Sequence, residues 1–459
     1  MGMVTTLLAG ALLAVLPPTA SAQQPAQAQP LTISQAIDLA LANYPAIRAA
    51  EGQASAARAG VDLARTAYLP HTDLIWQQDR ATRNNVAGLL LPQSVIPSIS
   101  GPISDTPSYG GVWGSAAGAL FSWEPFDFGL RRASVGVAEN LVKAATTTVE
   151  LTRLQVAVDA ADAFLNAAAA DEQVQTAHAD VNRRDVLSTS VATLVQNQLR
   201  PGADLSRAQA DLAAAKIQLI LSQRAAARAH ATLAEALGVA GQTVALEAGA
   251  LLTKTPAAPA ISAAPEAHPA AREQQAVIDT AHSRVRALAS AYVPRINFQS
   301  AVFARGAPPV TAAGTTGLFP TTTSNWAVGL TFSFPVFDVV SIGARRQVEL
   351  GNEATAKARY DQTVQTLRAD EARAKADLDA ARLIAENTPI ELQAARQAEA
   401  QVRARYDASL GTLSEVADVE RLLAQAEIDD QLARLGVWRA LLAEASAHGD
   451  LTLFLSQVK

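Results

Sequence analysis

The chain has 459 residues, enough for several domains or for one large repeated architecture. Acidic residues outnumber basic ones by 43 to 37, and this mild acidic excess gives no indication of nucleic-acid binding. There is no cysteine, which excludes disulfides, thiolate metal sites and a cysteine nucleophile. We also expect no N-terminal lipid on cysteine.

The first two dozen residues predict an export signal at 1–22. An apolar run at 4–16 ends at Pro17-Pro18, and Ala20-Ser21-Ala22 offers small residues for cleavage, although no Lys or Arg precedes the run. The run is too short to cross a membrane as a helix, and no later segment offers about 18 uninterrupted apolar residues. Any membrane-spanning part is therefore expected to consist of β-strands.

A Gln-, Pro- and Ala-rich stretch at 23–30 leads into the first predicted helix, 32–67, in which Tyr44-Pro45 marks a kink or a break. The period then changes, and the segments 73–80 and 109–123 predict two strands. The loop between them, at 87–108, is rich in Pro, Ser and Gly.

A proline-free stretch at 129–199 predicts one very long helix. At 1.5 Å per residue it would span on the order of 100 Å, too long for an ordinary core to enclose. Two heptad series of apolar residues lie about 200° apart around it. They are Val142, Val149, Val156 and Ala163, and Ala144, Leu151, Val158 and Leu165. Two seams favour a wall of helices over a coiled coil with a single seam, which remains the alternative. Arg200-Pro201-Gly202 ends the helix, and a return helix is expected at 204–237.

The same order of elements then repeats, which indicates an internal duplication. The paired landmarks, at offsets of 224 or 211 residues, are Tyr44-Pro45 with His268-Pro269, Tyr68-Leu69-Pro70 with Tyr292-Val293-Pro294, and Phe126-Asp127 with Phe337-Asp338. The expected division is a signal at 1–22, a first structural repeat at 23–254, a Pro/Ala-rich linker at 255–267 and a second repeat at 268–459.

The strands alternate in a way that fits a transmembrane β-barrel with a polar lumen. Half-buried strands of a soluble sheet would look the same locally. The residues expected to face lipid are Trp113, Phe121, Trp326, Val328, Leu330 and Phe332. Four strands cannot close a membrane barrel, and open edges are intolerable in lipid, so several chains must combine their strands. The loops at 87–108 and 306–322 are expected to face the outside of the cell.

At this point the chain resembles the TolC family of outer-membrane efflux and secretion channels. The resemblance rests on the duplicated layout, on the Tyr-Leu-Pro and Tyr-Val-Pro exits into strands, on the Phe-Asp turns into long helices, and on the segment 406–416, which is similar to the family's helical-tip signature. It implies a mostly α fold with membrane β. Four strands per chain would form a trimeric 12-strand β-barrel, continued by a 12-helix α-barrel that an adaptor protein opens or caps.

No catalytic constellation is visible, and the six histidines have no metal-ligand spacing, so neither a cofactor nor an enzyme is expected. The candidate sites lie at the helical tips. The residues expected to meet an adaptor are Arg200, Pro201, Gly202, Asp204, Ser409, Gly411 and Thr412. Glu415 and Asp418 share one helix face and would form carboxylate rings in a three-fold pore. Plain solvated helix faces are the alternative.

The sequence therefore predicts a passive exit duct in the outer membrane of a Gram-negative bacterium, with a long periplasmic extension. It would serve a tripartite efflux or type I secretion system. The expected partners are two further copies of the chain, a periplasmic adaptor, an inner-membrane pump of the RND, ABC or MFS type, and outer-membrane lipid, but no nucleic acid. The alternative is a periplasmic or surface coiled-coil scaffold or adhesin without a pore.

Overall fold

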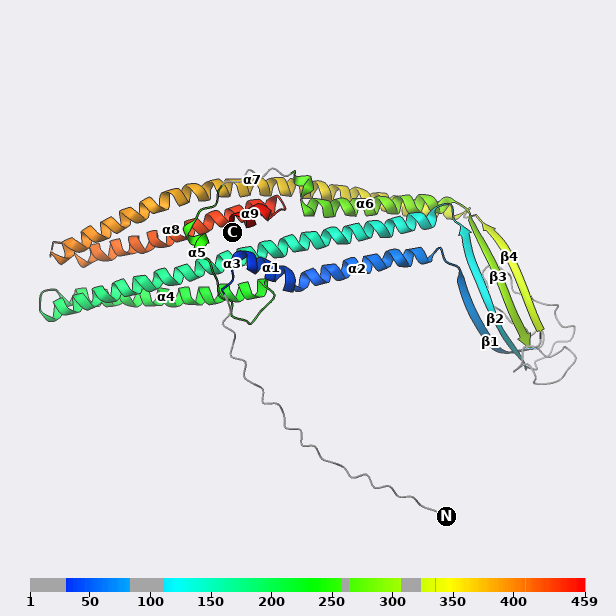
Figure 1. Cartoon of the computed structure of the whole chain (residues 1–459), viewed down its shortest axis with the longest axis horizontal. Coiled ribbons are helices and arrows are strands. Elements are labelled where there is room, and N and C mark those ends of the chain that lie inside the picture. The colour runs from blue at the N-terminus through cyan, green and yellow to red at the C-terminus, as the bar shows by residue number, and fades with distance from the viewer. Residues whose placement is uncertain are drawn as a thin grey trace, which may run out of the picture.

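The computed structural model describes residues 30–82, 111–257, 264–306 and 323–458, apart from Pro335 and Ser409. The expected signal at 1–22, the loop at 87–108 and nearly all of the loop at 306–322 lie outside these residues. The described chain forms a long, narrow molecule with a small sheet at one end and helical hairpins at the other (Figure 1). None of its helices is both long and apolar enough to cross a membrane.

Two helices run almost the whole length of the helical part. These are α3 (Leu130–Gln196, 67 residues) and α7 (Asp338–Asp407, 70 residues). Next to the sheet, α2 (Pro45–Thr66) packs on α3, and α6 (Pro269–Ala289) lies between α3 and α7. Farther from the sheet, α4 (Gly202–Ala236) takes over beside α3, and α8 (Leu413–Ala447) packs on both α7 and α3. The single long helix expected at 129–199 is confirmed, and it has helical neighbours on both flanks.

The break expected at Tyr44-Pro45 separates two helices. The first, α1 (Ile33–Asn43), begins with a capping box in which the Thr32 hydroxyl accepts from the Gln35 N–H and the Gln35 side chain accepts from the Thr32 N–H. Pro45 then starts α2 at a position where no intrahelical N–H is needed.

The sheet is antiparallel throughout, in the order β1-β2-β3-β4. Its strands are β1 (His71–Thr82), β2 (Gly111–Phe126), β3 (Arg295–Gly306) and β4 (Thr323–Ser333). The register pairs Trp123 with Phe298 and Val302 with Trp326, so the apolar residues of neighbouring strands share one face. The outer edges of β1 and β4 have no partner strand among the described residues.

The main hydrophobic core lies about midway between the sheet and the tip turns, where short segments pack around the long helices. Here α1, α5 (Gly249–Thr253) and α9 (Thr452–Val458) surround a stretch of α3 and the second half of α8. Phe164 and Phe454 are fully buried, and the Trp438 ring meets Phe454 edge-on with ring centroids 6.1 Å apart. The Trp438 indole N–H donates to the carbonyl of Lys254 at 3.0 Å, which ties the loop after α5 to α8. Two 3-10 turns, Pro265–Ala267 and Ser290–Tyr292, flank α6.

Candidate functional site

The turn between α3 and α4 is tight because several backbone groups close it. Gln198 takes a left-handed conformation with φ of 57°, and the Leu199 N–H donates back to the Leu194 carbonyl at 2.9 Å. Pro201 then caps α4, and its carbonyl accepts from the Asp204 N–H at 3.1 Å. The turn between α3 and α4 lies at the end of the molecule farthest from the sheet (Figure 1), and it contains Arg200 and Pro201, with Gly202 as the first residue of α4.

The turn between α7 and α8 reaches the same end by different local chemistry. The Thr412 hydroxyl accepts from the Glu415 N–H at 3.3 Å, and a Glu415 carboxylate oxygen accepts from the Thr412 N–H at 3.2 Å. A Cβ added to Gly411 would lie 3.2 Å from that carboxylate and 3.3 Å from the Tyr406 nitrogen, so the turn is closely packed there. Ser409 lies outside the described residues.

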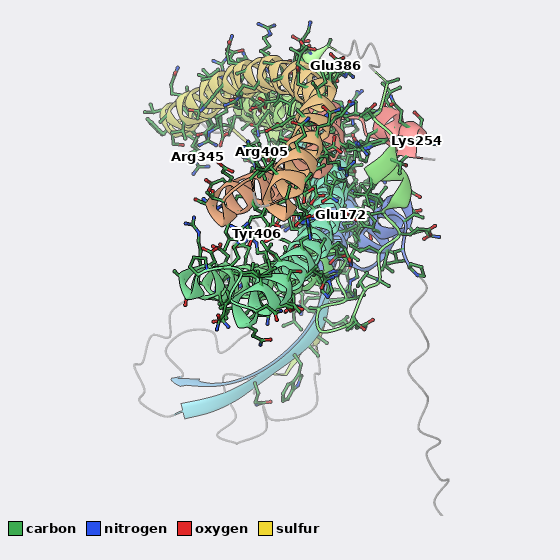
Figure 2. The ribbon with its side chains drawn as sticks, turned by 90° about the vertical axis from the view of Figure 1, so that its left-hand side faces the viewer. Glu172, Lys254, Arg345, Glu386, Arg405 and Tyr406 are labelled. Carbon is green, nitrogen blue, oxygen red and sulfur yellow. The ribbon has the colours of Figure 1, made fainter. Side chains whose placement is uncertain are left out.

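Arg200 joins the two hairpins. Its guanidinium lies 4.5 Å from the centre of the Tyr406 ring and donates to the Tyr406 carbonyl at 3.3 Å. Figure 2 looks onto this end and places Tyr406 between the two hairpins. A small apolar cluster backs the contact, formed by Leu187, Val191, Ala208, Tyr406, Leu413 and Val416. Arg200 thus holds the α3–α4 turn against the end of α7, and adaptor docking at the two turns stays a prediction. The pairing of Arg200 with Tyr406 could not be predicted from the sequence, because the two residues lie 206 positions apart.

Glu415 and Asp418 are both exposed just beyond the tip, and each already has a partner. Glu415 belongs to the capping box, and an Asp418 carboxylate oxygen lies 2.8 Å from an Arg421 guanidinium nitrogen. A role as lumen carboxylates stays a prediction.

Glu420 lies two residues after Asp418 on α8, and its burial was not predicted from the sequence. It is fully buried, and neither carboxylate oxygen has a hydrogen-bond partner among the described residues. Burial raises its pKa above the usual range, against the opposing charges of Arg184 and Arg403 and with help from Asp180 and Glu399. The sequence pattern that could have indicated this burial is the spacing of Glu420 from Val416 and Leu423, which places it on the same buried face of α8.

One face of the sheet exposes apolar side chains in a band. Trp326 is 77% exposed, and Val328, Leu330 and Phe332 are each more than half exposed. On the neighbouring strands, Phe121 meets Phe298 edge-on with centroids 6.0 Å apart. The side chain of Trp113 lies outside the described residues. So large an exposed apolar surface indicates contact with a partner or with lipid.

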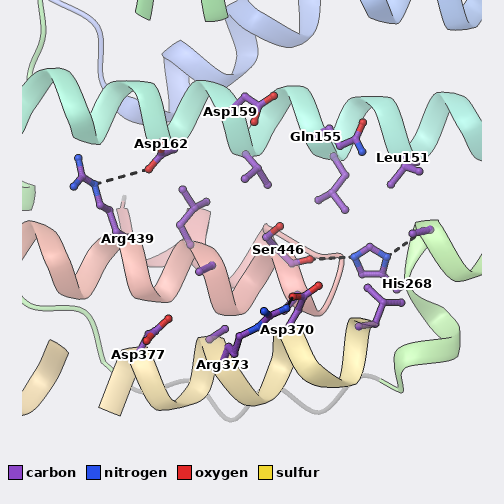
Figure 3. A pocket seen from close by; sticks show the side chains of 18 residues that line it. Leu151, Gln155, Asp159, Asp162, His268, Asp370, Arg373, Asp377, Arg439 and Ser446 are labelled. Atoms are coloured by element: carbon purple, nitrogen blue, oxygen red, sulfur yellow. Dashed lines mark hydrogen bonds and ion pairs between the residues drawn. The ribbon is translucent and has the colours of Figure 1, made fainter. Parts of the chain in front are cut away.

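A cavity of about 610 Å³ lies about midway along the molecule, between α3, α6, α7 and α8 (Figure 3). Both ring nitrogens of its only lining histidine, His268, serve structural bonds. Nδ1 accepts from the Ala270 N–H at 3.0 Å, and Nε2 donates to the Ser446 carbonyl at 3.1 Å. Burial lowers the pKa of His268, which favours this neutral form. In the part of the chain that the structure describes, no group of three or more His, Asp or Glu side chains could hold a metal ion.

An antiparallel sheet with an exposed apolar face, continued by helices of nearly 70 residues that end in packed turns, defines a subunit of an outer-membrane channel with a periplasmic extension. The model of the family described as outer membrane efflux protein matches residues 36–239 and 260–447, and the chain belongs to this family. This confirms the resemblance found in the sequence.

Individual relatives agree with this assignment. The chain is 26% identical over 391 residues to Protein CyaE of Bordetella pertussis. The aligned region covers 84% of this chain and 77% of that protein. The Campylobacter jejuni CmeC outer membrane channel has the same fold, with a TM-score of 0.74, 16% identity and coverage of 91% and 85% of the two chains. The outer membrane protein VceC of Vibrio cholerae gives a TM-score of 0.72 at 19% identity, covering 91% and 96%. The chain is an exit duct of the outer membrane whose helices extend into the periplasm.

Proposed function

We propose that three copies of this chain close into one duct, in which twelve strands form a barrel through the outer membrane and the helices form a tunnel below it. The supporting observation is the sheet, because β1 and β4 each leave one edge without a partner strand among the described residues, beside an exposed apolar face. Unpaired N–H and C=O groups are very costly in lipid, and pairing β4 of one chain with β1 of the next would satisfy them.

The duct would conduct passively and carry out no chemistry of its own. An inner-membrane pump of the RND, ABC or MFS type would supply the energy, and a periplasmic adaptor would connect the two. The adaptor would dock at the tip turns around Arg200 to Asp204 and Ser409 to Thr412, since these lie farthest from the sheet. Helical hairpins of the adaptor could extend the wall by the packing that already joins α3 to α4 and α7 to α8.

The internal duplication also belongs to this proposal. The elements α2, β1, β2, α3 and α4 are followed in the same order by α6, β3, β4, α7 and α8. Two repeats, at 23–254 and 268–459 with a linker at 255–267, would give each subunit pseudo-symmetric halves. A trimer would then present six similar hairpins around its axis.

Conduction by the purified protein tests the proposal against the scaffold or adhesin without a pore. Cross-linking in detergent should stop at trimers, and planar bilayers should show discrete conductance steps. A monodisperse monomer that conducts ions would overturn the trimer, and a trimer that never conducts would favour the scaffold. Epitope tags inserted at 87–108 and 306–322 should bind antibody on intact cells, and staining only after permeabilisation would reverse the orientation.

A further inference from the structure

The sheet end of the helical wall carries several exposed arginines that form no ion pair with any described residue. They are Arg132, Arg284, Arg286, Arg295, Arg345 and Arg346. Two neighbouring arginines do have acidic partners. Arg131 pairs with Asp127, and Arg65 lies within ion-pair distance of Asp62 and Glu139. Free arginines on a helix are usually just solvated. Here two of them face the same cavity.

That cavity, of about 670 Å³, lies between the end of α2 and the adjoining parts of α3 and α6. Arg132 lines it from α3 and Arg286 from α6. The lining also includes Tyr68 and the polar side chains of Asn140, Ser283 and Ser290. Small residues keep the α3 wall open, since a Cβ added at Gly129 or Gly136 would meet nothing within 4 Å.

The charge of this cavity favours an anion. Its only acidic lining residue is Glu139, and an Arg65 guanidinium nitrogen already donates to Glu139 at 3.5 Å. Arg132 and Arg286 therefore contribute two positive charges that no described side chain neutralises. Guanidinium groups bind phosphate through paired N–H donors, and serine and asparagine side chains suit the hydroxyls around a phosphate ester.

The cavity adjoins the apolar face of the sheet. Trp123 lies on that face, opposite Phe298, and its indole N–H donates to the carbonyl of Tyr68 at 3.2 Å. Tyr68 in turn lines the cavity. Phe126 and Leu69, which border this junction, are each about two-thirds exposed. Apolar surface and unpaired positive charge thus meet within a few residues, as they do where a protein leaves the lipid core for the headgroup layer.

We propose that this cavity binds the headgroup of an anionic phospholipid from the periplasmic leaflet of the outer membrane. Arg132 and Arg286 would hold the phosphate, and Ser283, Ser290 and Asn140 would bind the polar headgroup. The acyl chains would rise past Trp123 and Phe126 onto the apolar sheet face. A soluble anion would use the arginines but leave this apolar continuation empty, so a lipid fits the site better than free phosphate.

Lipid titration of the full-length protein tests the proposal, with native mass spectrometry counting bound lipids per subunit. In an uncharged detergent the wild type should retain phosphatidylglycerol in preference to phosphatidylcholine. The variant Arg132→Gln/Arg286→Gln should bind phosphatidylglycerol roughly 30-fold more weakly, since each basic residue near a lipid surface contributes about one kcal/mol. Arg132→Lys/Arg286→Lys keeps both charges and should retain most of the preference, which separates loss of charge from loss of fold.

The matched control is Arg224→Gln/Arg396→Gln, which removes from each of α4 and α7, far from the sheet, one exposed arginine that has no ion pair with a described residue. This control should bind phosphatidylglycerol as the wild type does. Equal retention of the two lipids by the wild type, or equal weakening in the control, would overturn the proposal. Competition by soluble glycerol phosphate at concentrations comparable to those of the lipid would overturn the lipid assignment and leave a plain phosphate site.

Discussion

Asp127 and Arg131 form a buried ion pair where β2 turns into α3. A carboxylate oxygen of Asp127 lies 3.0 Å from the Arg131 Nε, and only about a tenth of either side chain is exposed. Asp127 also accepts from the backbone N–H groups of Gly129 and Arg131. Arg131 in turn donates to the Ala67 carbonyl at 3.1 Å and lies 4.9 Å from the Tyr68 ring centre. The pair therefore fixes the chain that enters the sheet to the chain that leaves it.

Replacing Asp127 by Asn should destabilise the junction by about 3 kcal/mol, because it leaves the buried Arg131 without its counter-charge. Burial by itself raises the pKa of Asp127, but the hydrogen bonds and the charge of Arg131 outweigh it, so the net pKa is lowered. A lowered pKa gives stability that is present above the ordinary aspartate value of 3.8 and is lost as the pH falls through the folded-state pKa. Thermal dissociation of the purified assembly, followed from pH 7 down to pH 3, should show this acid loss in the wild type and less of it in Asp127→Asn.

The regular elements could be predicted from the sequence because their signals are local. The absence of proline and of interior glycine marks α3, Tyr44-Pro45 marks the break before α2, and alternation at 325–334 marks β4. Each of these signals depends on residues within a turn or two of one another. The tip turns were also predictable, since Pro201 and Gly411 interrupt helices at positions where the chain must reverse.

The contacts between these elements depend on residues far apart in the chain, and they could not be predicted from local sequence patterns. The main hydrophobic core joins α1, α5 and α9, and a single bridge pairs Leu31 with Leu246. These segments are too short to carry a periodic pattern. Nothing local showed that Arg131 would be buried, because an arginine in the first turn of a helix is usually solvated.

Removing the Arg200 side chain should loosen the contact between the two hairpins. Arg200→Ala loses both the hydrogen bond to the Tyr406 carbonyl and the stacking on its ring, so the purified channel should leak more current. Single-channel recording measures this leak. Tyr406→Phe is the control, because the Tyr406 hydroxyl has no hydrogen-bond partner among the described residues and the ring is kept. A leak as large in Tyr406→Phe as in Arg200→Ala would contradict a role for the stacked pair.

Added bulk at Gly411 should abolish transport while leaving the assembled protein in the outer membrane. A side chain there meets the Glu415 carboxylate and the end of α7, so Gly411→Trp disrupts the turn that an adaptor would contact. Export by the cells and the migration of unheated samples on gels measure the two effects. Gly351→Trp is the matched control, because it adds the same bulk at an exposed position of α7 away from the tip, where a Cβ meets nothing within 4 Å. Normal transport by Gly411→Trp would contradict adaptor docking at this turn.

Neutralising the tip carboxylates should lower the cation preference of the channel, provided that they face the lumen. Glu415→Gln should preserve the capping box, because glutamine serves at the same position. Asp418→Asn should change selectivity less, since Arg421 already offsets the Asp418 charge at 2.8 Å. Reversal potentials in asymmetric salt measure the preference. Unchanged potentials in the double variant would return both residues to solvated helix faces.

Glu420 lies where three helices meet, and charged groups face it from two of them. Arg184 and Asp180 come from α3, while Arg403 and Glu399 come from α7. Each arginine is already hydrogen-bonded to the acid on its own helix, at 2.9 Å for Arg184 with Asp180 and 3.4 Å for Arg403 with Glu399. Glu420 is therefore a surplus buried carboxylate.

Glu420→Gln should make the packing of α8 on α3 and α7 less sensitive to alkali. The pKa of Glu420 is raised by burial, so its stabilising contribution is complete below the ordinary glutamate value of 4.5 and is lost as the pH rises through the folded-state pKa. Glutamine keeps the volume without the charge. The variant should match the wild type near pH 4 and protect α8 amides better at pH 8, as hydrogen exchange of 413–430 would show. Glu391→Gln, which removes an exposed carboxylate from α7, controls for loss of charge alone. Weaker protection in Glu420→Gln at pH 8 would mean that the ionised carboxylate binds one of the two arginines and holds the three helices together.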